Sequence, residues 1–329
     1  MITDTKLRLL EYIETHGRAR PHELTSYLGI GSVAVHRQLK ALIDVGKISK
    51  TGKPPTVFYV LTDKKVNSGL IFEDGKTQQE IEKTYLYISP EGEMKFGFSG
   101  FAAWAVRVGM EKNISGLAME YIKIRHEADK FINKDGLIDA TEKMKNTFNN
   151  VWVDKTFYKD FYSLQKFGKT KLGQLVLYSK LAQRTELIQQ IARMTKKEID
   201  NLIARYDIEA VGFLPHSIPR KIQFLKVFSK ALNIRLPEIK LVKAYAGSIP
   251  VAQKSLSKLE ERIENASKTI EIKELQNRYN NILIIDDAVG SGATLNETAK
   301  KLKQANIAKN VYGFAIVGSM KGFEVIKEV

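Results

Sequence analysis

The stretch that most constrains the fold spans residues 281–294 and reads NILIIDDAVGSGAT. Its four consecutive apolar residues, 282–285, are typical of a strand that is buried on both faces of a sheet. Two adjacent carboxylates, Asp286 and Asp287, come where this strand is expected to end, and a loop of small residues leads to a helical pattern that starts near Leu295. A buried strand joined by a glycine-rich turn to a helix is a building unit of α/β folds, so we expect an α/β sheet here.

The residue types in this stretch predict a site for a phosphorylated sugar. Glycines let backbone N–H groups approach a phosphate, and the N-terminus of the following helix favours negative charge. The two carboxylates are suited to accept hydrogen bonds from a pair of ribose hydroxyls, either directly or through a divalent cation. An ordinary strand–helix turn with two solvated acids is the alternative. The candidate phosphate contacts are Ala288, Gly290, Ser291, Gly292, Ala293 and Thr294.

The order of residues in this stretch resembles the PRPP-binding motif of type I phosphoribosyltransferases: four apolar residues, two acids, then small residues ending in Gly-x-Thr. The resemblance implies an α/β fold of the type I phosphoribosyltransferase class, in which helices flank a parallel sheet. It also implies PRPP or a related ribose phosphate as the ligand, with Asp286 and Asp287 at the ribose hydroxyls. Mg²⁺ would arrive with the ligand, and these two carboxylates would help to place it.

A second segment, residues 247–265, is similar to the lid of the ComF-like branch of that family. Four residues match its spacing: Gln253, Leu256, Arg262 and Asn265. The resemblance, which covers about residues 155–320, implies a mobile lid that carries Lys254 and Arg262 over the pyrophosphate. By the same resemblance, the loop at 215–220 binds pyrophosphate through Arg220. A plain exposed helix and a surface arginine are the alternatives.

Residues 1–62 predict three helices followed by a β-hairpin whose loop spans 51–55, and this order resembles a winged helix-turn-helix. On the third helix, expected over 32–45, apolar residues form one stripe and polar residues face the other way. The segment carries nine basic and five acidic residues, a net charge of +4. We therefore expect duplex DNA as its partner, and a purely protein-binding module is the alternative. The candidate DNA contacts are Ser32, Val33, His36, Arg37, Lys40, Lys50 and Lys53.

The rest of the chain divides into two further segments. Residues 63–155 predict a linker with a β-hairpin and helices, a candidate hood or dimerisation region, which leaves a homodimer open. Residues 156–329 predict the phosphoribosyltransferase-like domain. Its alternating pattern indicates helices over 184–206 and 221–232, and strands over 208–214, 239–244 and 311–317.

Composition narrows the class of protein. Among 329 residues there is no cysteine, no signal-peptide pattern and no apolar run of membrane-spanning length, so we expect a cytoplasmic protein without a membrane partner. The net charge of +15 suits a polyanionic partner, although solvated lysine-rich surfaces would also produce it.

These observations favour a ligand-responsive DNA-binding regulator, with an arrangement of domains similar to that of purine-type repressors. The alternative is an active phosphoribosyltransferase or nucleotide glycohydrolase. A retron-type phage-defence effector belongs to this alternative by domain order alone. The sequence leaves catalysis and the acceptor open.

Overall fold

The computed structural model describes residues 4–62, 75–245, 247–249, 251–273 and 276–319. Residues 63–74 of the expected linker and the side chains of Lys53 and Lys254 lie outside this described part. The chain divides into two compact units, Met1–Glu73 and Asp74–Val329. Among the described helices, none is both long enough and apolar enough to cross a membrane.

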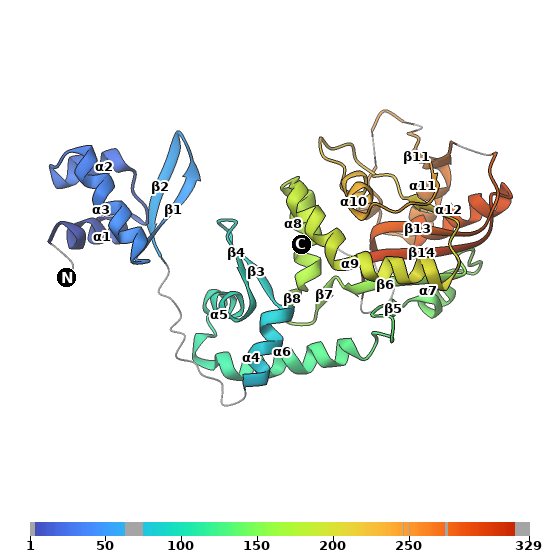
Figure 1. Ribbon diagram of the computed structural model, residues 1–329, viewed down its shortest axis with the longest axis horizontal. Helices are drawn as coiled ribbons and strands as arrows, with labels where there is room; N and C mark the ends of the chain where they lie inside the picture. The colour runs from blue at the N-terminus through green and yellow to red at the C-terminus, as the bar shows by residue number, and fades with distance from the viewer. Residues whose placement is uncertain (1–3, 63–74, 246, 250, 274–275, 320–329) are drawn as a thin grey trace. The chain divides into compact units, whose positions relative to one another are not determined.

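The described part of the first unit contains three helices and a hairpin (Figure 1). Its elements are α1 (Asp4–His16), α2 (Pro21–Leu28), α3 (Ser32–Asp44), β1 (Ile48–Lys53) and β2 (Thr56–Leu61). Pro21 occupies the first turn of α2, where its missing N–H costs nothing, and Gly29 ends the helix with a φ of 66°. Leu9, Leu24 and Leu39 meet in a small core. The helices predicted for this unit are therefore present at nearly the expected positions.

The hairpin has a shorter turn than the sequence suggested. Residues Thr51, Gly52 and Lys53 pair with Phe58, Val57 and Thr56, so β1 runs through most of the loop predicted over 51–55. That loop prediction was wrong. The turn falls on two prolines, which have no N–H to donate to a ladder. Gly52 pairs with Val57, and only glycine fits there because a Cβ would lie 2.2 Å from the Thr56 carbonyl oxygen.

A six-stranded sheet forms the centre of the second unit, and its strand order is β10-β9-β13-β14-β6-β5. The strands are β5 (Ile138–Asp139), β6 (Lys155–Phe161), β9 (Ala210–Phe213), β10 (Glu238–Ile239), β13 (Tyr279–Val289) and β14 (Ala308–Gly318). All neighbouring pairs are parallel except β5 with β6. The predicted mixed α/β architecture with a parallel sheet is thus confirmed.

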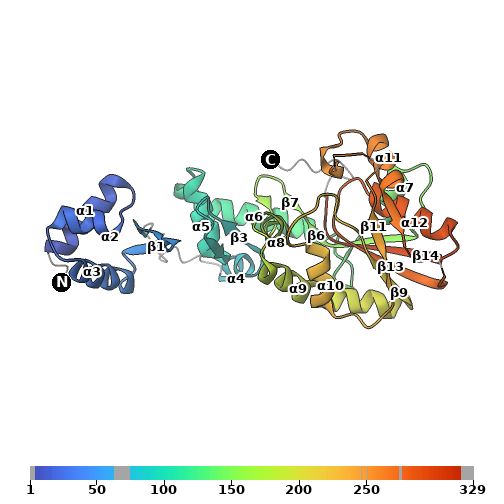
Figure 2. The same cartoon turned by 90° about the horizontal axis from the view of Figure 1, so that it is seen from above.

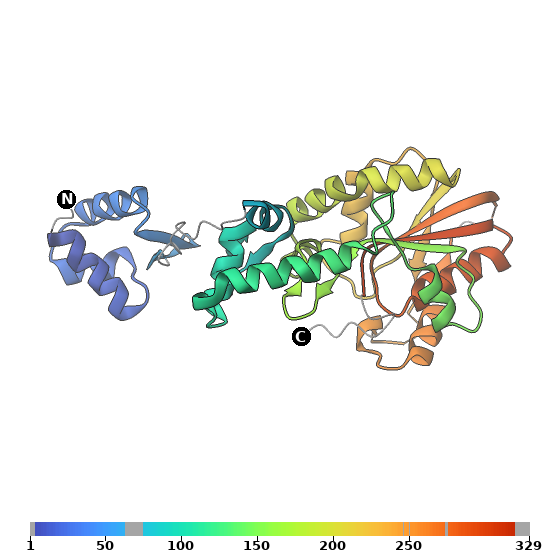
Figure 3. The same cartoon turned by 90° about the horizontal axis from the view of Figure 1, so that it is seen from below.

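Helices cover both faces of this sheet (Figures 2 and 3). One face carries α8 (Lys171–Leu181), α9 (Thr185–Arg205) and α10 (Phe224–Leu232), and the other carries α7 (Thr141–Thr147), α11 (Leu259–Thr269) and α12 (Ala293–Gln304). Alternate residues of the strands face the two layers, and on the first face Leu283 and Phe314 join the core of α8 to α10. The sheet is therefore buried on both faces, which explains the continuous apolar run at 282–285.

The strand predicted over 239–244 is in fact two strands in different sheets. β10 pairs in parallel with β9, whereas β11 (Leu241–Lys243) leaves the main sheet and pairs antiparallel with β12 (Ile270–Ile272). The prediction of one strand was wrong because the run of apolar residues continues across the break at Lys240. This switch places β11 beyond the end of β9, where the candidate site lies.

A module of helices precedes the sheet in sequence, and a short hairpin comes after β6. The module consists of α4 (Gly75–Thr84), β3 (Leu86–Ile88), β4 (Met94–Phe96), α5 (Gly97–Arg107), η1 (Glu111–Asn113) and α6 (Ile114–Asp129), and the later hairpin is β7 (Ser163–Leu164) with β8 (Gly168–Lys169). The hairpin predicted at β3 and β4 is present. Aromatic rings of Tyr85, Phe101, Trp104 and Tyr121 pack together in this module, and Phe167 of the later hairpin joins them.

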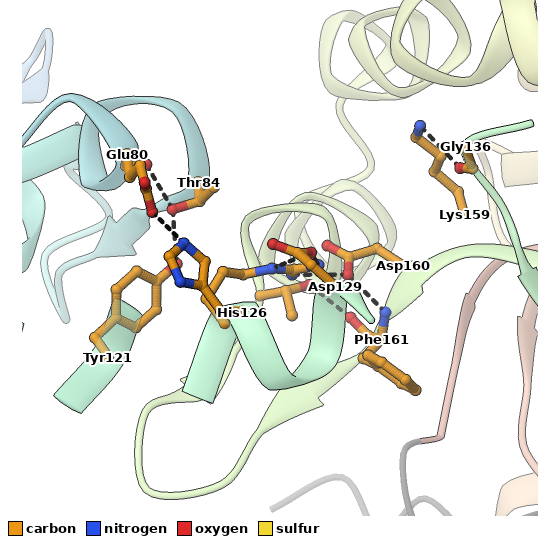
Figure 4. A network of polar contacts seen from close by, with 11 residues as sticks. Glu80, Thr84, Tyr121, His126, Asp129, Gly136, Lys159, Asp160 and Phe161 are labelled. Atoms are coloured by element: carbon orange, nitrogen blue, oxygen red, sulfur yellow. Dashed lines mark hydrogen bonds and ion pairs between the residues drawn. The ribbon is translucent and has the colours of Figure 1, made fainter. Parts of the chain in front are cut away.

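A polar network fastens the module to the sheet (Figure 4). The guanidinium of Arg125 on α6 is buried, and it donates to Asp129 on its own helix and to Asp160 on β6, at 2.8 Å in each case. One helical turn earlier on α6, Tyr121 donates to Thr84 of α4 at 3.0 Å. Since buried charges are stable only when they are paired, Arg125 fixes the position of α6 against the end of β6.

Candidate functional site

The candidate site is a pocket of about 730 Å³ at the carboxyl ends of β9 and β13. In open parallel sheets, ligands bind beyond the carboxyl ends of the strands. The walls come from the loop after β9, the end of β13 with its adjoining turn, the C-terminal part of α8, and β11. The pocket therefore collects segments that are far apart in the sequence, including both loops that the sequence analysis singled out.

The acid pair lies near the end of β13, just before the glycine-rich loop. The strand was expected to end at Ile285, but it continues to Val289 because Asp286, Ala288 and Val289 still pair with β14. The Asp286 carboxylate accepts a hydrogen bond from the backbone N–H of Asp287 at 2.7 Å. Burial, together with the neighbouring Asp287 charge, raises the pKa of Asp286 to about 7. One carboxyl of the pair therefore binds a proton near neutral pH.

A lysine that the sequence analysis did not identify reaches this acid pair. Lys180, near the end of α8, places its Nζ 2.7 Å from the Asp287 Oδ1. The carbonyl of the same lysine accepts a hydrogen bond from Arg220 Nη1 at 2.9 Å. Lys180 thus connects the acid pair with the loop after β9. No motif near position 180 marks it, because its role depends on the packing of α8 beside the strand ends.

The small-residue loop turns directly into α12. Gly292 caps the helix with a φ of 75°, and a Cβ there would lie 2.5 Å from the Met144 Sδ of α7. Two features disfavour any residue other than glycine at this position: the positive φ of the backbone and the contact with the methionine. The first N–H groups of a helix have no partner within it, so this turn offers donors for an anion.

The predicted phosphate contacts occupy this turn. Ala288, Gly290, Ser291, Gly292 and Thr294 line the pocket, whereas Ala293 is buried behind it. The Ser291 hydroxyl is mostly buried and accepts a hydrogen bond from the Ala293 N–H at 3.4 Å.

Asn296 anchors the first turn of α12 to the segment before β6. Its side chain accepts from the Trp152 N–H at 2.7 Å and donates to the Asn150 carbonyl at 3.0 Å. The start of the helix is therefore held from behind by another segment of the chain, and its N–H groups are preorganised. Such a rigid cradle lowers the entropic cost of binding an anion.

The loop after β9 is tied to its surroundings by several hydrogen bonds. Besides the bond from Arg220 to α8, the N–H of Ile222 donates to the Gln183 side chain at 3.0 Å, and the Tyr245 hydroxyl donates to the Ser217 carbonyl at 3.2 Å. Burial lowers the pKa of His216 at the pocket wall. Arg220, the predicted pyrophosphate ligand, lines the pocket, and one of its N–H groups already has a backbone partner.

Arg262, which the resemblance assigned to a mobile lid, is buried. It is only 5% exposed, and its Nε donates to the Leu256 carbonyl at 2.9 Å. This bond ties the residue after η2 (Gln253–Ser255) to α11. The Arg262 Nη2 is buried without a hydrogen-bond partner, and the residue lines the pocket. A buried donor nitrogen without an acceptor is costly, so Nη2 marks a place where an anionic group would be stabilised.

Gln253 and Asn265, which matched the lid pattern, bind each other behind Arg262. The Gln253 amide donates to the Arg262 carbonyl at 3.0 Å and to the Asn265 side chain at 3.2 Å. Lys243 of β11 also donates to Asn265, at 3.0 Å, and burial lowers the pKa of this lysine to about 8. Lys243 is a further pocket cation that sequence reasoning missed.

The described residues contain no group of three or more His, Cys, Asp or Glu side chains that could hold a metal ion. At the end of β13 the carboxylates of Asp286 and Asp287 face the pocket, and Lys180 already pairs with the second. Protein side chains alone therefore fit a resident divalent cation poorly. A cation at this site would depend on oxygen atoms that a bound ligand itself brings.

In the first unit, the predicted DNA contacts that the structure describes lie on one exposed surface of α3 or on the hairpin. Val33 is 83% exposed, and Ser32, His36, Arg37, Lys40 and Lys50 are the other contacts of this set. Sequence reasoning missed a second basic feature. The guanidinium groups of Arg18 and Arg20 lie 4.3 Å and 4.7 Å from the ring centre of Phe58 on β2.

Comparison with known proteins gives limited information. No family model matches the sequence, and no curated protein matches it. One similar solved structure is an adenine phosphoribosyltransferase, with 17% identity, a TM-score of 0.27 and coverage of 41% of this chain and 72% of that chain. A hypoxanthine phosphoribosyltransferase from Staphylococcus aureus has 16% identity, a TM-score of 0.25 and coverage of 44% of this chain and 70% of that chain. The adenine phosphoribosyltransferase from Leishmania tarentolae has 14% identity, a TM-score of 0.25 and coverage of 43% of this chain and 74% of that chain. At such low TM-scores these likenesses add no weight, and the function has to rest on the residues of this chain.

Proposed function

We propose that the pocket of the second unit binds PRPP or a related ribose phosphate, and that the first unit binds duplex DNA. The protein would then be a DNA-binding regulator that responds to this ligand. The observation that carries the proposal is the junction of β13 and α12, where an acid pair and a glycine-capped helix start face one pocket. A ribose phosphate offers a diol for the carboxylates and a phosphate for the N–H groups, so one ligand satisfies both ends.

The other end of the pocket suits the pyrophosphate of PRPP. Arg220 lines one wall, and Arg262, with its buried and unpartnered nitrogen, lines the same space. Guanidinium groups bind phosphate oxygens strongly because their donors match the geometry of the anion. Lys254 is a further candidate from the sequence. Mg²⁺ would accompany PRPP, bound to its pyrophosphate oxygens.

Calorimetry tests ligand binding directly. We expect PRPP to bind the wild type in the presence of Mg²⁺ and to bind the double variant Asp286→Asn/Asp287→Asn at least about tenfold more weakly, since each lost charged acceptor is worth about 1–3 kcal/mol. The matched control is Asp200→Asn, an exposed aspartate on α9 that pairs with Lys196. Equal affinity of the wild type and the double variant would refute the assignment of the acid pair.

DNA binding calls for a separate test, because it rests on other residues. The support is the row Val33, His36, Arg37 and Lys40 on α3, in a three-helix-and-hairpin unit with net positive charge. We expect duplex DNA to bind with an affinity that falls steeply with salt, and Arg37→Ala to weaken binding by about 1–3 kcal/mol. Arg193→Ala, an exposed arginine of α9, provides the same loss of charge in the other unit. Salt-independent binding, or equal effects of the two variants, would contradict the proposal.

Regulation requires that the two binding events be coupled. Ligand that shifts the DNA affinity must itself bind with a shifted affinity when DNA is present, by the same factor. We therefore expect fluorescence anisotropy of labelled DNA to give different dissociation constants with and without saturating PRPP. Identical dissociation constants would show that the two binding activities are independent, and this would contradict the regulatory role.

Catalysis is the second candidate function, and the unpartnered Arg262 nitrogen favours it because it would stabilise a leaving pyrophosphate. In the reaction the C1–O bond of PRPP breaks and pyrophosphate leaves with the electron pair. A nitrogen of a base, or the oxygen of water, then bonds to C1 and releases a proton. Pyrophosphate release from PRPP that disappears in Arg262→Met would support turnover. Absence of release with bases, nucleosides and water as acceptors would leave binding alone.

A further inference from the structure

Lys180 occupies a fixed position at the acid pair. Its Nζ lies 2.7 Å from the Asp287 Oδ1, and both side chains are only 23% exposed. The same ammonium group lies 5.8 Å from the ring centre of Phe224, the first residue of α10. Arg220 holds the Lys180 carbonyl from the other side. Three elements thus position one lysine, so its contact with the acid pair is not the chance encounter of a long surface side chain.

An ammonium group already neutralises one of the two carboxylates of the acid pair. Asp287 is paired with Lys180 at 2.7 Å, and Asp286 is the preceding residue on β13. Two other cations described at the pocket walls, Arg262 and Lys243, make hydrogen bonds to Leu256 and Asn265 instead. Divalent cations prefer several ionised oxygen ligands, and here one of two carboxylates already has an ammonium partner.

We infer that Lys180 supplies at the acid pair the positive charge that a divalent cation would otherwise supply, so that Asp286 and Asp287 accept the ribose hydroxyls directly. This inference rests on the proposed function, and it specifies how the sugar end of the ligand is held. Binding of a ribose phosphate at this end is then independent of Mg²⁺. Any Mg²⁺ that accompanies PRPP stays with the pyrophosphate oxygens.

The chemistry of the three side chains is consistent with this role. Carboxylates are acceptors and sugar hydroxyls are donors, so each aspartate can take one hydroxyl proton in a hydrogen bond. An ammonium group has three N–H donors, of which one is used by Asp287, and the others can donate to hydroxyl oxygens. Lys180 therefore both neutralises the pair and completes the hydrogen bonding of a diol.

Ribose 5-phosphate is the probe that isolates this end of the site, because it carries the diol and the 5′-phosphate but no pyrophosphate to chelate Mg²⁺. Calorimetric titrations are run in EDTA and in excess Mg²⁺, and PRPP is titrated in the same two buffers. For the wild type we expect equal affinities for ribose 5-phosphate in both. For Lys180→Met we expect about a tenfold loss in EDTA, the size of one charge-assisted hydrogen bond, with part of the loss recovered in Mg²⁺.

Two further variants control for charge and for folding. Lys171→Met removes the same charge from the first turn of α8, where Lys171 Nζ donates to the Lys83 carbonyl, and should bind like the wild type. Lys180→Arg keeps the positive charge and should stay independent of Mg²⁺, which provides a test if Lys180→Met does not fold.

The outcomes separate the inference from the proposed function. If neither ligand binds the wild type in either buffer, the proposed function fails, and the inference with it. If the wild type binds but requires Mg²⁺ for ribose 5-phosphate, the proposed function stands and the inference is overturned. The inference is also overturned if a folded Lys180→Met binds ribose 5-phosphate in EDTA with wild-type affinity. A Mg²⁺ requirement for ribose 5-phosphate binding by Lys180→Arg overturns it too.

Discussion

Replacement of Asp286 by asparagine should make the second unit more stable at neutral and alkaline pH. Asparagine has nearly the same shape, and its amide oxygen can still accept the hydrogen bond from the Asp287 N–H. The substitution removes a carboxyl whose pKa is raised by burial and by the Asp287 charge. A charged group buried at a candidate binding site lowers the stability of the fold, as is common at functional sites.

The size and sign of the effect come from the pKa. The Asp286 pKa rises from 3.8 to about 7 on folding, which corresponds to about 4 kcal/mol at about 1.36 kcal/mol for each pH unit. Between these two values the folded state binds the proton and the unfolded state does not, so stability falls as pH rises and levels off above about pH 7. From about pH 5 to about pH 7 the wild type should lose about 2 kcal/mol through this group. The variant should not show this loss.

Urea denaturation monitored by tryptophan fluorescence measures this effect in the full chain. Both tryptophans, Trp104 and Trp152, belong to the second unit, so the signal reports that unit alone. His216, whose pKa is lowered by burial, gives a slope of opposite sign, but it is present in both proteins and cancels in their difference. Asp200→Asn is the control for loss of an exposed charge. A difference between Asp286→Asn and wild type that stays constant from about pH 5 to about pH 8 would refute the reasoning.

Three other substitutions test the packing around the site. Gly173→Ala, which in most helices gains up to about 1 kcal/mol, should instead destabilise by about 1–3 kcal/mol, because its Cβ would lie 2.1 Å from the Tyr162 carbonyl oxygen; the urea midpoint measures the sign. Arg125→Met should cost about 3–5 kcal/mol, since it leaves Asp160 without its buried partner, and an unchanged midpoint would show that the network in Figure 4 is not needed. Gly292→Ala should weaken PRPP binding in calorimetry and lower stability by about 1–2 kcal/mol through its positive φ alone, and wild-type values in both would contradict the strain.

The sequence predicts those parts of the fold whose pattern is set locally. Residues 282–285 are apolar without interruption because the strand is covered on both faces, and the pattern is unambiguous. Strand β6, with the sequence KTFYKDF, gives no such signal although it lies inside the sheet between β14 and β5. Its Asp160 is paired with Arg125 and its Lys159 with Glu198, the latter at 2.7 Å. Polar residues that form ion pairs with residues distant in sequence make an interior strand look like an exposed one. No local sequence pattern predicts those ion pairs.

In the candidate site, too, the sequence predicts what is local and not what depends on tertiary packing. The acid pair and the phosphate loop are adjacent in sequence, so their order alone predicts that they share a pocket, and they do. Lys180 enters the pocket only because α8 packs beside the strand ends. The hydrophobic periodicity of the sequence predicts the helix but not the elements against which it packs. Arg262 was expected on a mobile lid, and in the structure α11 packs against α12, so that both Ala266 and this arginine are buried. Burial of a charged residue depends on which helix lies opposite, and this information is tertiary.

The place of β14 in the sheet has a consequence for biosynthesis. In the described sheet β14 joins β13 on one side to β6 on the other, and it comes after the other five strands in sequence. All described residues that line the pocket precede it. A nascent chain that has not yet released residues 308–318 from the ribosome therefore contains these pocket residues but two unjoined halves of a sheet. The proposed ligand should therefore bind only after β14 has emerged, and a chain shortened before β14 should retain every one of these pocket residues and bind nothing.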